Sequence, residues 1–276
     1  MASDVVAVSV SVTVTGPSIT ILVLKYGAPA AAVALIVYGI RHGYLKQVQR
    51  RLFTLIATRF TSDHIKAAVD GHKVPLFALL RSLQSSDPAL RSSGPGVLRI
   101  LEIGVGDGAN LKYYPTGTQL TSVEPNPYFE SYFKRNSHKF PHIEVKKFIR
   151  GSAEDMFDVK SESVDVVVST HVLCSVSDVD RCLKEVSRVL VPGGKLFFFE
   201  HISFDWKKDW IRALFQTVCE PFWSLASDGC SLRRDPRPLL LANDFVLVQQ
   251  DEVQIDGIYA LMKPHAIGIA EKALVT

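Results

Sequence analysis

The sequence predicts an α/β fold in which helices cover both faces of a mainly parallel β-sheet. Two observations predict this fold. From residue 97 onward, short apolar runs alternate with helical stretches, and the first apolar run passes directly into a turn with three glycines. A third observation, the apolar segment 19–40, predicts an N-terminal membrane-anchoring helix in addition to the sheet.

The glycine turn follows the first predicted strand, residues 97–103. Gly104, Gly106 and Gly108 stand at every second position. A Cβ atom there would keep a ligand away from the backbone of the turn, so this spacing indicates a binding site. We expect a helix to begin directly after the turn. Its unpaired N–H groups and positive dipole end would favour a nucleotide-like or carboxylate-bearing cofactor.

Two types of cofactor fit this turn. Gly104, Gly106 and Ala109 also satisfy the G-x-G-x-x-G/A pattern of dinucleotide-binding proteins, so a nicotinamide or flavin stays open at this point. The second predicted strand, residues 120–124, ends in Glu124, where a carboxylate can accept hydrogen bonds from ribose hydroxyls. Glu124 fits both types of cofactor, and it also fits an ordinary solvated acid at a strand end.

The residues after the third and fourth predicted strands favour an adenosyl cofactor. The third strand, residues 143–149, is followed by Ala153 and Glu154. A small residue before an acid suits an adenine ring and its exocyclic amine. The fourth strand ends in Thr170. The chain then continues as a helix, a turn and a fifth strand, at residues 179–190, 192–194 and 195–200.

In this order, five sequence motifs resemble the class I S-adenosylmethionine-dependent methyltransferases: residues 102–108, Glu124, and residues 152–155, 165–168 and 188–194. The resemblance implies a Rossmann-like, seven-stranded sheet with an antiparallel last strand, which residues 245–253 and 265–270 would complete. It also implies S-adenosylmethionine as the cofactor. The residues expected to bind it are Glu102, Gly104, Gly106, Gly108, Asn110, Glu124, Pro125, Asn126, Ala153, Glu154 and Thr170.

Further motifs are similar to one family within this class, the membrane-anchored thiol S-methyltransferases of the endoplasmic reticulum and lipid droplets. They are residues 108–110, 114–115, 124–127, 172–176, 200–201, 220–221 with Trp223, 228–230, and 264–265 with Gly268. The resemblance implies methylation of a small lipophilic thiol. It also implies membrane lipid as a partner and a catalytic domain that faces the cytosol.

The sequence departs from this family at several positions. Val105 and Asp107 stand where the family usually has Cys and Thr, and Glu124 replaces an Asp but keeps the carboxylate. His171 stands where the family has Leu, and Pro236 replaces an aromatic residue. The last two changes fall where substrate is expected, so the resemblance says least about the substrate.

Composition excludes several classes of function. The net charge is only +3 and no nucleic-acid-binding motif is present, so we expect no nucleic-acid partner. The four cysteines have no C-x-x-C spacing, which indicates reduced thiols and neither disulfides nor a bound metal. Hydrophobic residues make up 47% of the chain, a share that exceeds the usual level for a soluble enzyme because of the N-terminus.

The first 96 residues are expected to form two regions before a catalytic domain at 97–276. Residues 1–43 are the predicted anchor: as a helix, the segment 19–40 would be ~33 Å long, and the bilayer core is ~30 Å thick. Basic residues follow this segment, which favours a cytosolic catalytic domain. Residues 44–96 are expected to contain a basic amphipathic helix at 44–60, lying on a membrane or packed on the domain, and a linker at 82–96.

Methyl transfer to a thiol needs the thiolate, so a base near the acceptor would help. The candidates are His201 and His171, each at the end of a predicted strand, with His265 as a weaker third; each could also be structural. Cys174 fits a buried structural cysteine better than a reactive one. Residues 204–244 carry all three tryptophans and are expected to cover the substrate as an apolar lid. A basic cluster there, Arg233, Arg234 and Arg237, faces either phospholipid or solvent.

Together these features predict a membrane-anchored, S-adenosylmethionine-dependent methyltransferase of a small lipophilic thiol. Two alternatives stay open. An O- or C-methyltransferase of a quinone, sterol or other lipid would share the same sheet motifs. A membrane or lipid-droplet scaffold would have a vestigial cofactor site, although the intact glycines and Glu124 speak against it. The sequence leaves protein partners unknown.

Overall fold

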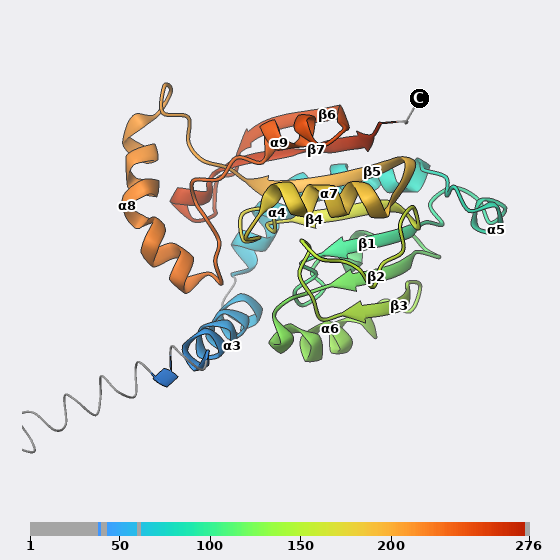
Figure 1. The fold of residues 1–276 in the computed structure, drawn as a ribbon, viewed down its shortest axis with the longest axis horizontal. Helices are drawn as coiled ribbons and strands as arrows, with labels where there is room; N and C mark the ends of the chain where they lie inside the picture. Colours follow the sequence, from blue (N-terminus) through green and yellow to red (C-terminus); the bar gives the residue numbers. More distant parts are fainter. Residues whose placement is uncertain (1–37, 40–42, 60–61, 274–276) are drawn as a thin grey trace, which may run out of the picture. The chain divides into compact units, whose positions relative to one another are not determined.

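The computed structural model describes residues 38–39, 43–59 and 62–273, and its centre is one seven-stranded sheet (Figure 1). The strand order is β3-β2-β1-β4-β5-β7-β6. Strands β1 to β5 run parallel, and β7 is antiparallel to both β5 and β6. The predicted sheet is therefore confirmed. Its strands are β1 Arg99–Ile103, β2 Gln119–Val123, β3 Glu144–Ile149, β4 Val164–Thr170, β5 Leu190–His201, β6 Phe245–Gln254 and β7 Pro264–Lys272.

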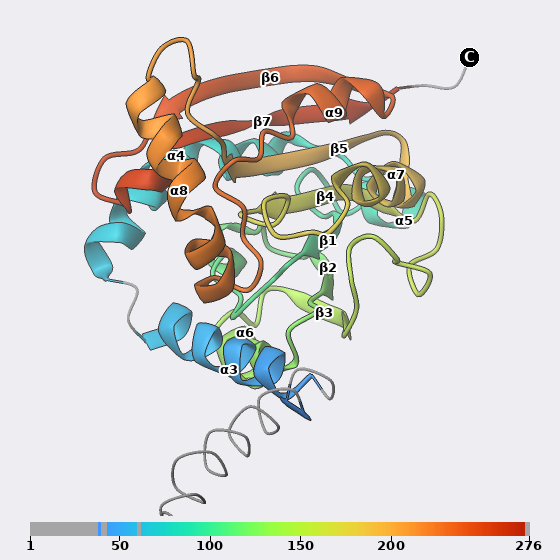
Figure 2. The same cartoon turned by 60° about the vertical axis from the view of Figure 1, so that its left-hand side comes forward.

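Helices lie on both faces of this sheet, with α7 and α9 on one face and α4 on the other (Figures 1 and 2). The chain divides into two compact units, residues 1–48 and 49–276, and the second unit holds the sheet. The α-helices are α3 Tyr44–Arg59, α4 Asp63–Ala78, α5 Pro88–Arg91, α6 Glu130–Ser137, α7 Val179–Val189, α8 Trp210–Ala226 and α9 Arg237–Ala242. The 3₁₀ turns are η2 Leu79–Ser82, η3 Leu111–Tyr113, η4 Pro127–Phe129 and η5 Ala260–Met262.

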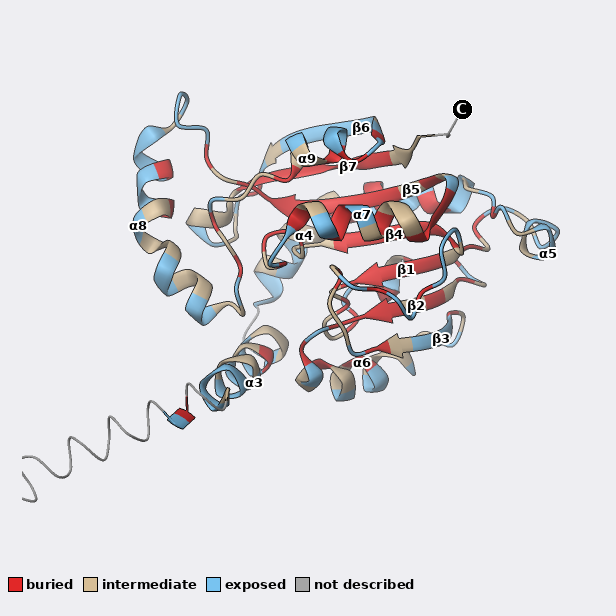
Figure 3. Ribbon diagram, viewed as in Figure 1, coloured by how far each residue is buried: buried red, intermediate tan, exposed pale blue. Residues whose placement is uncertain are grey.

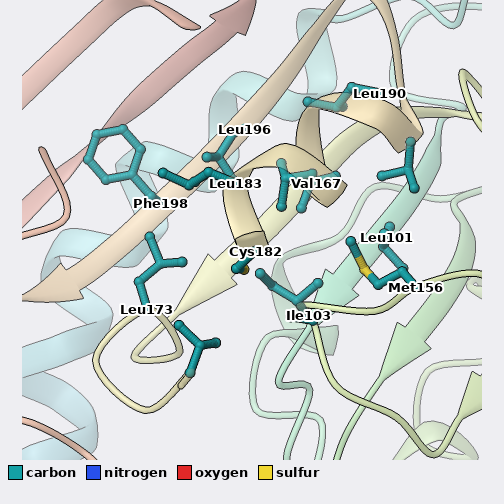
Figure 4. Packing of buried hydrophobic residues seen from close by; sticks show 14 of the residues in the cluster. Leu101, Ile103, Met156, Val167, Leu173, Cys182, Leu183, Leu190, Leu196 and Phe198 are labelled. Carbon is teal, nitrogen blue, oxygen red and sulfur yellow. The ribbon is translucent and has the colours of Figure 1, made fainter. Parts of the chain in front are cut away.

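Helix α7 buries one apolar stripe against the sheet. The Asp178 side chain accepts a hydrogen bond from the backbone N–H of Arg181 and so caps the start of the helix. The stripe follows helical spacing, because its members recur every three or four residues: Val179, Cys182, Leu183, Val186 and Val189. It packs against Leu101, Val167 and Leu196 of the central strands, which are fully buried (Figure 4). This packing holds β1 and β4 side by side.

The opposite face of the sheet is covered by the end of α4 and the 3₁₀ turn after it. Leu76, Phe77 and Leu80 are buried there against Ile100 and Phe197. These residues precede residue 97, where the sequence predicts the catalytic domain to begin. The core of the sheet therefore includes part of the region predicted as helix and linker.

The prediction of a helix directly after the glycine turn is wrong. In the structure, only the three-residue 3₁₀ turn η3 follows it, and the next α-helix is α6, after β2. Pro115 and Gly117 come within a few residues of η3, and proline cannot continue a helix. The turn after β1 consequently has no long helix whose dipole could act on a cofactor.

The turn predicted at 192–194 lies inside a continuous strand. Leu190 pairs with Val164, and Lys195 pairs with Val166, so five residue steps on β5 match two on β4. The extra residues form a bulge in β5, which glycine permits because Gly193 has a φ of 72°. The strand thus begins five residues before the predicted start at residue 195.

The predicted membrane helix, residues 19–40, lies outside the described residues except for Tyr38 and Gly39. Within the part of the chain that the structure describes, no helix is long and apolar enough to cross a bilayer. The amphipathic helix expected at 44–60 is confirmed as α3. Its residues Leu52, Leu55 and Ile56 are exposed.

Candidate active site

A cleft of about 640 Å³ opens where β1 and β4 end, the point at which the strand order reverses. Seven of the residues predicted from the sequence line it: Glu102, Gly104, Gly106, Gly108, Asn110, Thr170 and His171. Residues of α4, among them Lys73, complete the wall. The volume lies within the range of small-molecule sites. The cleft is therefore the candidate cofactor site.

The three glycines of the turn serve different purposes, although all have positive φ. A Cβ atom on Gly104 would come within 2.4 Å of Val172, and one on Gly108 within 2.6 Å of Leu111. These two glycines are therefore required by packing inside the protein. A Cβ atom on Gly106 would meet nothing closer than a ring atom of Phe129 at 4.0 Å. Gly106 is the position where the backbone is left open for a ligand.

A buried polar network forms the floor of the cleft. The amide of Asn110 donates to the carboxylate of Glu102 at 2.7 Å and to the hydroxyl of Thr170 at 2.9 Å. Its oxygen accepts a hydrogen bond from Lys73 Nζ at 3.0 Å. Tyr114 donates to the second oxygen of Glu102 at 2.7 Å. Both ends of the Asn110 amide are thus fixed, which positions the charged groups of the floor.

Lys73 is a site residue that the sequence reasoning missed. It is buried on α4, with its Nζ 5.3 Å from the centre of the Phe199 ring. Burial lowers its pKa to about 8, although the neighbouring Glu102 opposes this shift. Burial likewise raises the pKa of Glu102 to about 7. The signal in the sequence was one lysine on the apolar face of a helix, between Val69 and Phe77.

Glu124, at the end of β2, closes the glycine turn. Its carboxylate accepts hydrogen bonds from the backbone N–H groups of Gly106, at 2.9 Å, and Asn126, at 2.8 Å. Burial raises its pKa to about 7. The Asn126 side chain donates to Asp228 at 3.0 Å, and the Pro125 carbonyl accepts from Arg50. These three residues are not among those that line the cleft.

Ala153 and Glu154, which the sequence predicts to contact adenine, both make contacts within the protein. Ala153 is buried in the core cluster beside α7. The carboxylate of Glu154 accepts hydrogen bonds from the backbone N–H of Ser177, at 2.6 Å, and from the Ser152 hydroxyl. Glu154 thereby holds the loop before α7, and its role toward the cofactor stays a prediction.

His171 lines the cleft and pairs with His265. Their Nε2 atoms are 2.9 Å apart, and His265 Nδ1 lies 3.1 Å from the Lys263 carbonyl oxygen. A carbonyl only accepts, so Nδ1 of His265 carries the proton and its Nε2 accepts from His171. Burial lowers the pKa of both rings, that of His265 to about 3. Both are therefore neutral near pH 7, and His171 has the unusual φ of 57°.

His201 lies away from the cleft lining, in a buried group with two cysteines. Its Nε2 is 3.0 Å from Cys230 Sγ, and its Nδ1 has no hydrogen-bond partner among the described residues. Trp223 of α8 donates to the same sulfur at 3.4 Å. Hydrogen bonds from the Cys174 thiol and from His201 lower the pKa of Cys230. Cys174 is buried, as predicted.

The cluster of arginines faces neither phospholipid nor bulk solvent as a group. The Arg234 guanidinium donates to the backbone carbonyls of Leu173, Cys174 and Val176, at 2.9, 3.1 and 2.6 Å. Arg237 forms ion pairs with Asp235 and Glu252. Only Arg233 of the three is exposed. The predicted cluster therefore mainly fixes the loops between β4 and β6.

Comparisons with known proteins agree with this geometry. The family described as "Methyltransferase domain" matches residues 101–198. Thiol S-methyltransferase TMT1A of Homo sapiens is 39% identical over 65% of this chain and 73% of its own length. Thiol S-methyltransferase TMT1B of Rattus norvegicus is 33% identical over 93% of this chain and 98% of its own length.

Among solved structures, a putative methyltransferase in complex with the Haloferax volcanii Trm112 methyltransferase activator has a similar fold. The TM-score is 0.57 with 13% identity, over 80% of this chain and 97% of that chain. This likeness concerns the fold alone. The cleft, with Gly106 open to a ligand and a charged floor, fits S-adenosylmethionine as the cofactor. From the sequence relatives and the sheet together, the chain belongs to the thiol S-methyltransferase family of class I S-adenosylmethionine-dependent methyltransferases.

Proposed function

We propose that this protein transfers the methyl group of S-adenosylmethionine to a small lipophilic thiol at a membrane surface. The observation that carries the proposal is the cleft at the ends of β1 and β4, in a chain whose relatives are named thiol S-methyltransferases. A nicotinamide or flavin would also need a turn open at Gly106. The relatives favour the methyl donor.

The residues of the cleft have distinct tasks in this reaction. S-adenosylmethionine would supply an electrophilic methyl on a sulfonium, and the residues of the cleft would hold it for attack by the acceptor sulfur. Lys73 and Glu102 present buried charges of opposite sign, which suit the carboxylate and amine of an amino-acid group. Gly106 lets the ligand approach the backbone.

The exposed face of α8 supports a membrane location. Helix α8 lies beyond the ends of the parallel strands, and much of its surface is exposed (Figures 1 and 3). Seven large apolar residues on it are between 44% and 76% exposed: Trp210, Ile211, Leu214, Phe215, Val218, Phe222 and Leu225. They follow helical spacing, so they form one apolar stripe. Soluble proteins rarely leave such a patch in water, and a lipid surface would cover it.

The proposed location is the endoplasmic reticulum membrane or the lipid droplet, with the sheet on the cytosolic side. Residues 19–40 would act as the anchor, and the exposed α8 stripe would contact lipid. A thiol dissolved in the bilayer could then reach the enzyme without crossing bulk water.

Product analysis tests the reaction. The purified full chain in detergent is given methyl-labelled S-adenosylmethionine with an alkyl thiol, a catechol and a quinol side by side. Label on the thiol alone is expected. Label on an oxygen or carbon would show an O- or C-methyltransferase instead. No label, together with no cofactor binding, would show a scaffold.

Flotation with phosphatidylcholine vesicles tests the membrane surface. We compare the protein with the triple variant Phe215→Ser, Val218→Ser and Phe222→Ser. Residues 1–40 are deleted from all the proteins compared, so that only the remaining surface can bind. The triple variant should then lose at least half of its vesicle binding. Val246→Ser with Val248→Ser, which changes equally exposed residues of β6, serves as the control and should bind as before. Equal vesicle binding by all three proteins would show that the α8 stripe does not contact the membrane.

A further inference from the structure

Three side chains from separate segments of the chain meet beside α8. Cys174 comes from the loop after β4, His201 is the last residue of β5, and Cys230 follows α8. Their sulfur and nitrogen atoms all lie within 4.8 Å of one another. Their exposed fractions are 2%, 1% and 6%. In the described part of the chain, no other group of three or more His, Cys, Asp or Glu side chains is gathered in this way.

The donor set matches what zinc prefers. Zinc binds thiolate sulfur at about 2.3 Å and imidazole nitrogen at about 2.0–2.1 Å, so tetrahedral neighbours are roughly 3.5–3.8 Å apart. The distance from His201 Nε2 to Cys230 Sγ is 3.0 Å, and none of the three atom pairs exceeds 4.8 Å. Changes of about 1 Å or less in these distances would bring the three atoms into this geometry. Two thiolates would also neutralise the charge of the ion, which suits a buried site.

The loops that carry the cysteines are held by hydrogen bonds. The backbone N–H of Ser231 donates to the Cys174 carbonyl at 2.9 Å, so the two cysteine loops are tied together. Arg234 donates to three carbonyls of the loop around Cys174. Trp223 donates to Cys230 Sγ, as outer partners of metal ligands commonly do. These bonds fix the two cysteine loops and the Cys230 sulfur in position.

Three protein ligands leave one position of a tetrahedral zinc free, and this is the pattern of catalytic zinc sites. The group lies close to the cofactor cleft, because the ring of His171, a cleft residue, is centred 6.1 Å from that of His201. We propose that Cys174, His201 and Cys230 bind a zinc ion whose fourth position takes the acceptor thiol. The zinc site stands on this geometry alone, and the role of the thiol rests on the proposed function.

The proposed step transfers one methyl group and releases one proton. The acceptor thiol binds the zinc as a thiolate, and its proton leaves to solvent, because coordinating thiols are deprotonated. The thiolate sulfur then forms a bond to the methyl carbon while the bond from that carbon to the sulfonium sulfur breaks. The sulfonium takes the electron pair and becomes a neutral thioether. The methylated product is also a thioether, a weaker zinc ligand than a thiolate, so it can leave.

Metal loading of the purified full chain is the first test. After treatment with chelator, cobalt(II) is added as a spectroscopic substitute for zinc, and zinc competition is measured. One cobalt per chain is expected, with thiolate-to-cobalt charge-transfer bands that zinc abolishes. Cys174→Ser and Cys230→Ser should each weaken cobalt binding at least 100-fold. Cys182→Ser, which changes a buried cysteine of α7, should bind as the parent does.

X-ray absorption at the zinc edge needs no variant, so it covers the case in which a cysteine variant does not fold. Two sulfurs and one nitrogen around zinc are expected in the unmodified protein. A shell of nitrogen and oxygen alone, less than stoichiometric metal, or equal binding in all three variants would overturn the zinc site.

The fourth position is tested by adding an alkyl thiol to the cobalt protein. A new charge-transfer contribution is expected from the third sulfur. An unchanged spectrum would overturn the role of the thiol and leave the zinc site standing. Because these readouts do not depend on methyl transfer, their failure differs from failure of the proposed function, which the labelled-product experiment detects.

Discussion

Buried ionisable groups differ between the two ends of the parallel sheet: the environment disfavours their ionised forms at the carboxyl end and favours the ionised form at the amino end. At the carboxyl end, burial lowers the pKa of Lys73 to about 8 and raises those of Glu102 and Glu124 to about 7. At the amino end, burial of Asp165 also opposes ionisation. There, hydrogen bonds from Arg99 and from two serines outweigh it and lower the pKa of Asp165 to about 2.

This difference separates residues that serve binding from residues that serve stability. Asp165 accepts from the Arg99 guanidinium at 2.9 Å, from the Ser85 hydroxyl at 2.7 Å and from the Ser86 N–H at 2.9 Å. Its charge is thus fully compensated within the protein. Lys73 and Glu102 are compensated less, so their ionised forms cost stability that a bound ligand can repay. Variants at the two ends should consequently have different effects.

The largest effect is expected for Gly106→Arg at the carboxyl end. A long side chain would enter the cleft, and the φ of 55° is unfavourable for any residue but glycine. Affinity for S-adenosylmethionine, measured by calorimetry, should fall at least 100-fold, or about 2.7 kcal/mol. Gly71→Arg, at an open and exposed position on α4, should leave the affinity unchanged. Retained micromolar binding by Gly106→Arg would place the cofactor elsewhere.

Lys73→Met should weaken binding without weakening the fold. Removal of the charged donor is expected to lower cofactor affinity by roughly 10- to 100-fold, about 1.5–3 kcal/mol. Protonated Lys73 costs about 3 kcal/mol at neutral pH, given its pKa of about 8, so the free energy of unfolding should stay equal or rise.

The pH dependence of the parent protein gives a second measure of Lys73. Its folded pKa lies below the ordinary value of 10.5, so the parent gains stability as pH rises from about 8 toward 10.5. Urea unfolding of Lys73→Met should lack this gain. Lys184→Met, at an exposed position of α7, should keep it. A large loss of stability in Lys73→Met at pH 7 would contradict the contrast between the two ends.

Asp165→Asn should have the opposite pattern, with lower stability and unchanged cofactor affinity. The folded pKa of about 2 lies below the ordinary 3.8, so the ionised form contributes about 2 kcal/mol. This contribution is complete above about pH 4 and is lost as pH falls through 2. Urea unfolding should therefore show a difference of about 2 kcal/mol at pH 7 that shrinks below pH 4. Asp158→Asn, which changes a more exposed ion pair, should alter the free energy of unfolding by less than about 0.5 kcal/mol.

Much of the carboxyl end was predictable because its residues are close in sequence. The strand before Gly104, the glycine turn and Glu124 each follow from a short run of residues. The structure places the turn at the cleft, whereas the Glu124 carboxylate binds the turn backbone and does not line the cleft. The absence of a helix after the turn was also predictable, because Pro115 and Gly117 leave room for little more than one helical turn. The general strand–turn–helix pattern predicts a helix here, but these two residues end it after one 3₁₀ turn.

Other parts of the site depend on contacts that no local pattern encodes. Lys73 lies on a helix before the first strand and reaches Asn110 only because α4 packs on the sheet. Cys174, His201 and Cys230 come from three separate segments, so the lack of C-x-x-C spacing said nothing about their proximity. The inward role of Arg234 likewise requires the fold, because its partners are backbone carbonyls rather than acids.

The smallest effect is expected for Tyr114→Phe, and it measures how strongly the floor depends on a single hydrogen bond. Tyr114 donates to buried Glu102, whose folded pKa of about 7 lies above the ordinary 4.5. Stability from Glu102 is therefore present at low pH and lost as pH rises through 7. Without the donor, the carboxylate is harder to form, so the pKa of Glu102 should rise further.

The loss of stability in Tyr114→Phe should thus be about 1 kcal/mol at pH 8 and smaller at pH 5, where Glu102 is protonated in both proteins. Urea unfolding at the two pH values measures this difference. Tyr113→Phe, which changes the neighbouring tyrosine paired with Asp70, is the matched control and should show no such dependence on Glu102. An equal loss for Tyr114→Phe at both pH values would mean that Glu102 is ionised throughout, with the floor compensated as fully as the amino end.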